Sequence, residues 1–294
     1  LDRLCPNRLE SNYTDQLRYI KEPSGELMST RTQPYQHEHT RSWYAATVNE
    51  VTDYPQLQEN LSVDVCIVGG GFTGVATALT LAERGYRVAL LEANRIGWGA
   101  SGRNGGQLIN GISGLAKIQK RYGEGLADML WDLRWRGNDI VRERVAKYAI
   151  DCDLRDGFVE TAVKPRHVKA LEEWASEMER RRFPHAWEVW DQAKTREMLG
   201  TEGYIGGFVS YHDGHLHPLN LCQGEARAAA GLGVQLFEDR EALALERQGS
   251  RVAVSTAGGR VSAASVVLAG NASPQLEVRK LPGQVFPAGS YIIA

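Results

Sequence analysis

A glycine-rich turn followed by an acidic residue is the stretch of this chain best suited to chemistry. Gly69, Gly71 and Gly74 have the spacing G-x-G-x-x-G, which permits a tight turn, close approach of a diphosphate to the backbone, and close helix–strand packing. Glu92 follows Gly74 by 18 residues (92 − 74), near the roughly 20 expected for an acid that binds a ribose. The pattern indicates a site for an adenine dinucleotide. It argues against NADP, because the carboxylate would repel a 2′-phosphate.

The neighbouring residues predict the elements that position these groups. The apolar run 64–68 suits a buried strand, and 87–91 suits a second strand that ends at Glu92. Residues 73–84 predict a helix, whose N-terminus offers unpaired N–H groups and about half a positive charge to a phosphate. The cofactor-binding residues expected in this unit are Gly69, Gly70, Gly71, Phe72, Thr73, Gly74, Glu92 and Ala93.

A second glycine-rich segment, residues 93–107, follows at once. Its five glycines disfavour a helix and let the backbone lie against a flat ligand. We interpret it as a loop around the pyrophosphate and the isoalloxazine edge of a flavin, where a cationic Arg103 would stabilise the reduced anion. The alternative is a surface loop without a ligand. The residues assigned to the cofactor here are Gly99, Ala100, Ser101, Arg103, Asn104, Gly105, Gly106 and Gln107.

Three histidines and an aspartate lie together in the stretch HDGHLHP, residues 212–218. Such residues can ligate a metal, but no Cys or Glu pattern accompanies them, and Pro218 suits the first position of a helix running to about residue 230. We therefore predict no metal here, and a loop that leads from a strand at 206–211 into a helix of the cofactor domain. The candidate catalytic residues are Arg103, His215 and His217, since either histidine could face the flavin or the substrate.

Periodicity predicts the remaining elements. An amphipathic helix at 125–148 places Met129 and Leu133 on an apolar face that we assign to the core, and a second helix covers 165–181. Strand-like runs occur at 158–163, 234–237, 242–247, 251–255 and 261–268.

Length and composition limit the class of protein. A chain of 294 residues is enough for one large domain or two interleaved ones. Its formal net charge of −2 gives no reason to expect nucleic-acid binding, and no apolar run approaches the roughly 20 residues that span a bilayer. The four cysteines have no disulfide or zinc spacing, and we expect no signal peptide. These features favour a cytoplasmic location.

Several segments together resemble the D-amino-acid-oxidase-like family of FAD-dependent oxidoreductases. They are HTRSWYAA (39–46), VDVCIVGGGFTG (63–74), LLEANRIGWGASGRNGGQ (90–107), HDGHLHPLNL (212–221) and FPAGSYIIA (286–294). The resemblance covers about residues 39–294, and the 90–107 motif is much more specific than the glycine fingerprint.

The resemblance implies an α/β fold, in which a Rossmann-like FAD-binding domain is interleaved with an antiparallel-sheet substrate domain of α+β character. It implies noncovalent FAD, since Ser101 and Gly102 stand where covalently flavinylated relatives have a histidine. It also implies that the Ala242 backbone lies near the adenine, and that Ala269 and Gly270 lie near the pyrophosphate.

The reaction implied is oxidation of the C–N bond of an amine or amino acid. A hydride passes to flavin N5, the imine hydrolyses, and oxygen reoxidises the flavin. The expected partners are oxygen and an amine, with a gamma-glutamylputrescine-like substrate favoured; no nucleic acid and no membrane span are expected. A NAD-dependent dehydrogenase is an alternative that shares Glu92 but gives no reason for the loop at 97–107. An inactive truncated flavin-binding remnant is another.

The family pattern also predicts the division of the chain. Proteins of this kind continue beyond position 294, so we expect a chain that is truncated at its C-terminus and binds FAD weakly or not at all. Met28 is a candidate natural start, because residue 1 is leucine. The predicted parts are an N-terminal extension and arm (1–60), the FAD domain (61–155 and 212–275), the first part of the substrate domain (156–211) and the start of a return to that domain (276–294).

Overall fold

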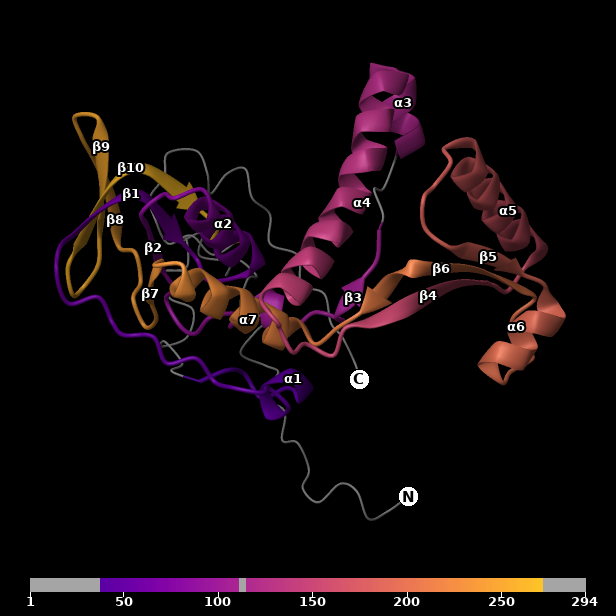
Figure 1. Ribbon diagram of the computed structural model, residues 1–294, viewed down its shortest axis with the longest axis horizontal. Helices are drawn as coiled ribbons and strands as arrows, with labels where there is room; N and C mark the ends of the chain where they lie inside the picture. Colours follow the sequence, from indigo (N-terminus) through magenta and orange to yellow (C-terminus); the bar gives the residue numbers. More distant parts are fainter. Residues whose placement is uncertain (1–37, 111–114, 272–294) are drawn as a thin grey trace, which may run out of the picture. The chain divides into compact units, whose positions relative to one another are not determined.

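The computed structural model describes residues 38–110 and 115–271, which belong to the unit Tyr35–Ala294 (Figure 1). The other unit, Leu1–Pro34, lies outside the described residues, as do Met28, the motif 286–294 and the predicted return segment 276–294.

Strands and helices alternate over much of the described chain (Figure 1). The strands are β1 (Leu61–Val68), β2 (Val88–Leu91), β3 (Gln107–Leu108), β4 (Arg155–Ala162), β5 (Trp187–Trp190), β6 (Gly206–His215), β7 (Gln235–Phe237), β8 (Ala244–Gln248), β9 (Arg251–Ser255) and β10 (Arg260–Leu268). The helices are α1 (Trp43–Ala46), α2 (Phe72–Glu83), α3 (Leu115–Tyr122), α4 (Glu124–Lys147), α5 (Pro165–Arg180), α6 (Gln192–Leu199) and α7 (Pro218–Gly231), with a 3₁₀ turn, η2 (Ala100–Gly102).

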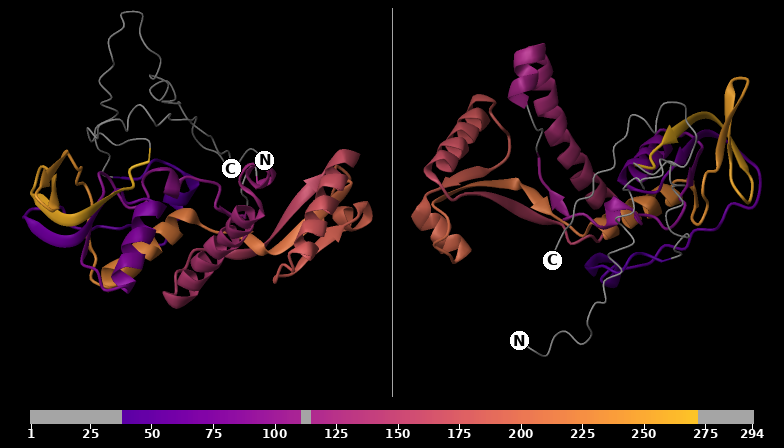
Figure 2. Two further views of the ribbon diagram at one scale, coloured as in Figure 1. Left: turned by 90° about the horizontal axis from the view of Figure 1, so that it is seen from above. Right: turned by 180° about the vertical axis from the view of Figure 1, so that it is seen from behind.

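A six-stranded sheet in the order β7-β2-β1-β10-β9-β8 positions the glycine turn. The strands β7, β2, β1 and β10 are parallel, whereas β9 and β8 are antiparallel to their neighbours. Alternate residues face opposite sides: Val65 and Ile67 belong to one apolar cluster and Cys66 to another. Helices α2 and α7 lie side by side over the first cluster, as Figure 1 and Figure 2 show. Strand β1 is therefore covered on both faces, which explains its continuous apolar sequence.

A second, antiparallel sheet is organised around β6, which pairs with β3, β4 and β5. Its apolar cluster joins Trp131 and Trp135 of α4, Met178 of α5 and Phe208 of β6. The predicted fold class, a mainly parallel sheet with helices combined with an antiparallel sheet, is confirmed.

Two local predictions are wrong. Strand β6 runs on to His215, so His212 and Asp213 lie in a strand and not in a loop. Helix α4 forms almost where predicted, but Met129 and Leu133 are 56% and 60% exposed. Its buried face carries Trp131 and Arg134 instead, because the contacts of α4 with the aromatic cluster of the second sheet decide which face is covered.

Among the helices of the described ranges, none combines the length and the apolar character that crossing a bilayer requires.

Candidate dinucleotide-binding site

In the turn between β1 and α2, Gly69 and Gly74 cannot carry a side chain unless the backbone shifts. Gly69 has φ +111°, and its N–H donates to the Leu91 carbonyl at 2.8 Å. A Cβ on Gly69 would lie 2.6 Å from the Ala269 oxygen, and a Cβ on Gly74 would lie 1.8 Å from the Gly69 oxygen. These contacts place Ala269 and Gly270, after β10, directly beside the glycine turn.

The first turn of α2 is capped from outside the helix, by Ser101. Gly71 is the N-cap and has no side chain to occupy the end of the helix. The Phe72 N–H donates to Ser101 Oγ at 2.9 Å, and a Cβ on Gly71 would lie 2.9 Å from the same oxygen. The N–H groups of a helix N-terminus suit a diphosphate, and Ser101 adds a hydroxyl at that place.

Glu92 lies at the C-terminal end of β2, beside this turn. Its Oε2 accepts a hydrogen bond from the Gly70 N–H at 2.6 Å, and its Oε1 accepts one from the Asn94 N–H at 2.9 Å. Burial raises the pKa of the Glu92 carboxyl, although the backbone N–H groups act in the opposite direction. A carboxylate held here has acceptor capacity for ribose hydroxyls.

Hydrogen bonds join the loop at 93–107 to the glycine turn, and others form within the loop itself. The Gly97 N–H donates to the Gly70 carbonyl at 2.9 Å. Within the loop, Asn104 Nδ2 donates to the Ser101 carbonyl at 2.9 Å, and Asn104 Oδ1 accepts from the Gly106 N–H at 2.8 Å. Asn104 therefore braces the loop from inside, and Ser101 is the residue that reaches the helix N-terminus.

Two motifs that are far apart in the sequence meet here. A Cβ on Gly97 or Gly102 would lie 2.8 or 3.0 Å from Leu219 Cδ1 of α7. The Gly106 carbonyl accepts a hydrogen bond of 2.8 Å from the Leu216 N–H. The loop at 93–107 and the segment at 212–221 thus form one packed unit, in which the glycines provide room for α7.

Arg103 lies on the exposed side of this loop. Its Nε donates to the Gly99 carbonyl at 3.2 Å, Nη1 donates to Thr40 Oγ1 at 3.3 Å, and the guanidinium carbon lies 5.0 Å from the Trp98 ring centroid. The arginine joins the loop to the segment before α1. Its role beside a flavin stays a prediction.

The two candidate histidines occupy different environments. His217 is buried at the N-cap of α7, where Nδ1 accepts from the Asn220 N–H at 3.1 Å and Nε2 lies 3.1 Å from Thr47 Oγ1. Burial lowers the pKa of the His217 imidazole. Both ring nitrogens have partners in the protein, so we infer a capping role. His215 is exposed at the end of β6, opposite Gln107 of β3, and its catalytic role stays a prediction.

Ala269 directly follows β10, and Ala242 lies two residues before β8. The Ala269 N–H donates to the Val68 carbonyl at 2.8 Å, which extends the β1–β10 pairing to the glycine turn. Ala242 is buried in the apolar cluster that includes Leu91 and Ala89.

Asp213 of β6 holds the chain that follows β3. Its Oδ1 accepts a hydrogen bond from the backbone N–H of Asn110 at 3.0 Å.

Glu238, which directly follows β7, is a residue that the sequence reasoning missed. It is fully buried and accepts hydrogen bonds from the Ile96 N–H at 2.7 Å, the Tyr54 N–H at 3.0 Å and Arg95 Nη1 at 3.0 Å. It therefore fixes the start of the loop and the chain before β1. Its only sequence signal is one acid after a short apolar strand, which is too common to be specific.

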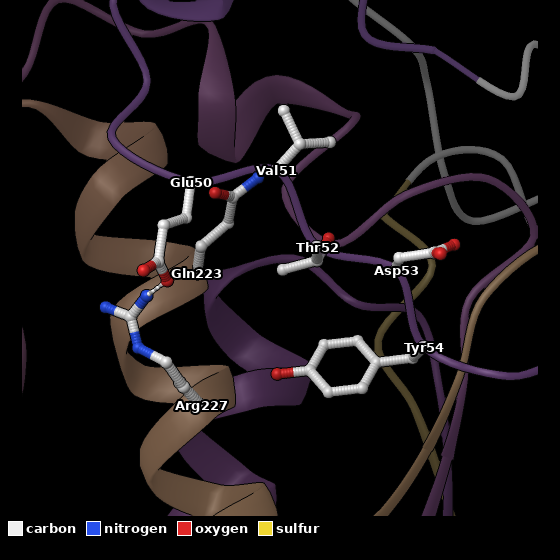
Figure 3. Close-up of a pocket in the computed structure, with 7 residues that line it drawn as sticks. All are labelled: Glu50, Val51, Thr52, Asp53, Tyr54, Gln223 and Arg227. Carbon is white, nitrogen blue, oxygen red and sulfur yellow. Dashed lines mark hydrogen bonds and ion pairs between the residues drawn. The ribbon is translucent and has the colours of Figure 1, made fainter.

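A cavity of about 190 Å³ lies between residues 50–54 and α7, as Figure 3 shows. Its walls include an ion pair between Glu50 and Arg227 and the ring of Tyr54. None of the predicted cofactor-binding residues lines it, so this cavity is separate from the glycine turn.

Comparisons with known proteins agree with the geometry of the turn. The family model described as FAD dependent oxidoreductase, DAO, matches residues 64–294. The chain is 41% identical over 252 residues to gamma-glutamylputrescine oxidoreductase of Escherichia coli (strain K12), covering 83% of this chain and 59% of that protein. It is 38% identical over 262 residues to a probable oxidoreductase OrdL of Haemophilus influenzae, covering 87% and 61%. The chain thus spans about three fifths of the length of these relatives.

Solved structures show the same fold. Glycine oxidase from Geobacillus kaustophilus matches with a TM-score of 0.58 and 27% identity, over 72% of this chain and 56% of that one. L-amino acid deaminase from Proteus vulgaris matches with a TM-score of 0.62 and 24% identity, over 76% and 50%. Because the family match includes the glycine turn, Glu92 and the loop that packs on α7, the chain belongs to the D-amino-acid-oxidase-like family of FAD-dependent oxidoreductases.

Proposed function

We propose that the glycine turn of this protein is a noncovalent FAD site and that the flavin serves the oxidation of a C–N bond in an amine or amino acid. The observation that carries the proposal is the position of the Glu92 carboxylate, 2.6 Å from the Gly70 N–H and beside the α2 N-terminus, whose N-cap residue is Gly71. An acid for the ribose and N–H groups for the diphosphate are thereby placed at neighbouring points of one sheet edge.

The residues of the chain have separate tasks in this proposal. Glu92 accepts hydrogen bonds from ribose hydroxyls. The backbone at Phe72 and Thr73, with Ser101, binds the diphosphate. Among the described residues, Gly270 has open space where a side chain would stand. The chemistry that FAD supplies when bound is acceptance of a hydride from the carbon beside the amine nitrogen. The protein contributes binding and orientation of an unprotonated amine.

The substrate we propose is a gamma-glutamylputrescine-like amine, with oxygen as electron acceptor. Support comes from the 41% identity to gamma-glutamylputrescine oxidoreductase over 83% of this chain. Arg103 and His215, both on exposed sides of the packed loop and β6, are the side chains we propose to examine first for contact with substrate.

The test measures cofactor and turnover separately. FAD is titrated calorimetrically into residues 1–294 and into a form extended to the length of the relatives, and peroxide release is then measured with gamma-glutamylputrescine, putrescine, glycine, sarcosine and D-alanine. In the extended form we expect a flavin absorption spectrum and peroxide release that is fastest with gamma-glutamylputrescine. Binding of NAD without FAD in both forms would reject the flavin site. Flavin binding with another preferred amine would reject only the substrate.

A further inference from the structure

A cluster of ligand-type side chains lies apart from the glycine turn, where α4 packs against the second sheet. Asp139 belongs to α4, His212 to β6, and His185 to the segment before β5. His212 Nε2 lies 2.9 Å from Asp139 Oδ1, and His185 Nε2 lies 3.9 Å from the same oxygen. One ligand atom from each residue lies within 4.8 Å of the others.

The two imidazole rings are stacked face to face, with centroids 3.5 Å apart and planes 4° from parallel. Two imidazolium cations at this separation would repel each other. Neutral imidazole is the metal-binding form of histidine.

His212 Nε2 is a buried nitrogen whose neighbour is the Asp139 carboxylate. The side chain is 10% exposed, and the approach of Nε2 to Asp139 lacks hydrogen-bond alignment. Most buried polar side-chain atoms in folded proteins have a bonding partner, and a bound ion can be that partner.

We propose that Asp139, His185 and His212 bind one divalent transition-metal ion, with Zn²⁺ as the best match and water in the fourth position. Two imidazoles and a carboxylate are established zinc donors, with Zn–N of about 2.0–2.1 Å and Zn–O of about 2.0–2.2 Å. This site differs from the one considered in the sequence, because His215 and His217 take no part in it.

Metal binding requires one local movement. The nitrogen lone pairs of the stacked rings lie in two parallel planes, so one ion cannot lie in both planes. His185 therefore turns about its terminal torsion to aim Nε2 at the ion. That torsion has a broad, two-fold profile, and the His185 side chain is 34% exposed, which leaves it room.

The surroundings are compatible with a cation. Arg142 Nη2 donates to the His212 carbonyl at 2.6 Å, but its Nη1 is paired with Asp156 at 2.5 Å. Trp135 and Phe183 contribute aromatic rings next to the histidines. An ion here would tie α4 to the β5–β6 side of the second sheet, and would stabilise the fold because only the folded chain assembles the three ligands.

The test is calorimetric titration of Zn²⁺ into the tag-free, chelator-treated chain. A Cys5→Ser background removes an alternative thiol ligand. We expect one Zn²⁺ per chain, and at least tenfold weaker binding in Asp139→Asn, His185→Gln and His212→Gln. The matched control is His215→Gln, an exposed histidine on the same strand as His212. A Zn²⁺-dependent rise in Tm, reversed by chelator and absent from the ligand variants, is the second readout.

Of the three ligand variants, His185→Gln is the one we expect to disturb folding least, because the His185 side chain is the most exposed of the three. Circular dichroism checks the fold of each variant. Absence of stoichiometric Zn²⁺ in the parent chain would overturn the proposal. So would equal affinity in the parent and in His185→Gln. Glu92→Gln leaves Zn²⁺ binding unchanged if the two sites are independent, so failure of the flavin proposal would be seen separately.

Discussion

The Glu92 carboxylate accepts a 2.6 Å hydrogen bond from the backbone N–H of Gly70, which joins the end of β2 to the turn after β1. The parallel register of the two strands, with Val68 opposite Leu91, brings these residues together. The acid is thus positioned by the sheet and does not depend on a flexible loop.

Glu92→Gln should weaken FAD binding by about tenfold or more, because hydrogen bonds to a charged group contribute roughly 1.5–3 kcal/mol. Calorimetric titration of FAD measures the change. Glu246→Gln is the control, since Glu246 is an exposed residue of β8. Equal losses in the two variants would contradict a specific role for Glu92.

Gly74→Ala should destabilise the chain by about 2 kcal/mol or more, because its Cβ would lie 1.8 Å from the Gly69 oxygen and the backbone must shift. Gly137→Ala, also within a helix, should instead stabilise by about 0.5–1 kcal/mol. A Cβ on Gly137 has no atom within 4 Å among the described residues. Urea unfolding of both variants checks the opposite signs, and a stable Gly74→Ala would show that the turn tolerates a side chain.

Arg144→Met should cost about 3–5 kcal/mol, because it leaves the Glu225 carboxylate buried without its cation. Arg144 Nη1 lies 2.9 Å from Glu225 Oε1, and Nη2 donates to Thr80 Oγ1 of α2 at 2.6 Å. The side chains of Arg144 and Glu225 are only 11% and 4% exposed. Arg227 of α7 forms an exposed ion pair with Glu50. Arg227→Met breaks that pair and should lower the free energy of unfolding by less than about 1 kcal/mol. A double-mutant cycle with Glu225→Gln measures the coupling; similar costs for the buried and the exposed pair would contradict the argument.

Acidification should reveal the contribution of Glu177. Hydrogen bonding from Arg180, followed by that from Arg181, lowers the pKa of the Glu177 carboxyl to about 2, whereas its ordinary value is 4.5. A lowered carboxyl pKa stabilises the fold above the unfolded value, and this stabilisation disappears as the pH falls from about 4.5 to 2.

Glu177→Gln should therefore cost about 1 kcal/mol at pH 7, after allowance for solvent screening, and should make the remaining stability less sensitive to pH in that interval. Urea midpoints at pH 7 and pH 3 measure both effects. Glu179→Gln, exposed on the same helix, is the control. A parallel loss of stability on acidification in all three proteins would show that the ion pairs of Glu177 contribute nothing measurable.

Sequence reasoning succeeds where the signal is local. The spacing of Gly69, Gly71 and Gly74 predicts a turn that the structure shows with φ +111° at Gly69 and with contacts too close for a side chain at Gly74. Pro218 correctly predicts the start of α7. These residues act through backbone geometry within a few positions, so their neighbours in the sequence are sufficient to interpret them.

It fails where packing partners are distant. Periodicity assigns Met129 and Leu133 of α4 to the core, but it does not show which face the second sheet covers. The buried positions include Arg134, whose guanidinium carbon lies 4.0 Å from the Trp131 ring centroid. A cation that stacks on aromatic rings is not apolar, so a hydrophobicity pattern does not detect it.

The sequence alone therefore determined the family, the glycine turn and the acid at the end of β2, because each depends on residue types at fixed short spacing. Only the tertiary structure decided that Ser101 reaches the α2 N-terminus, that His217 caps α7, and that Asp139, His185 and His212 meet. These contacts join segments separated by many residues, and long-range packing of helices and strands, not local spacing, brings such segments together.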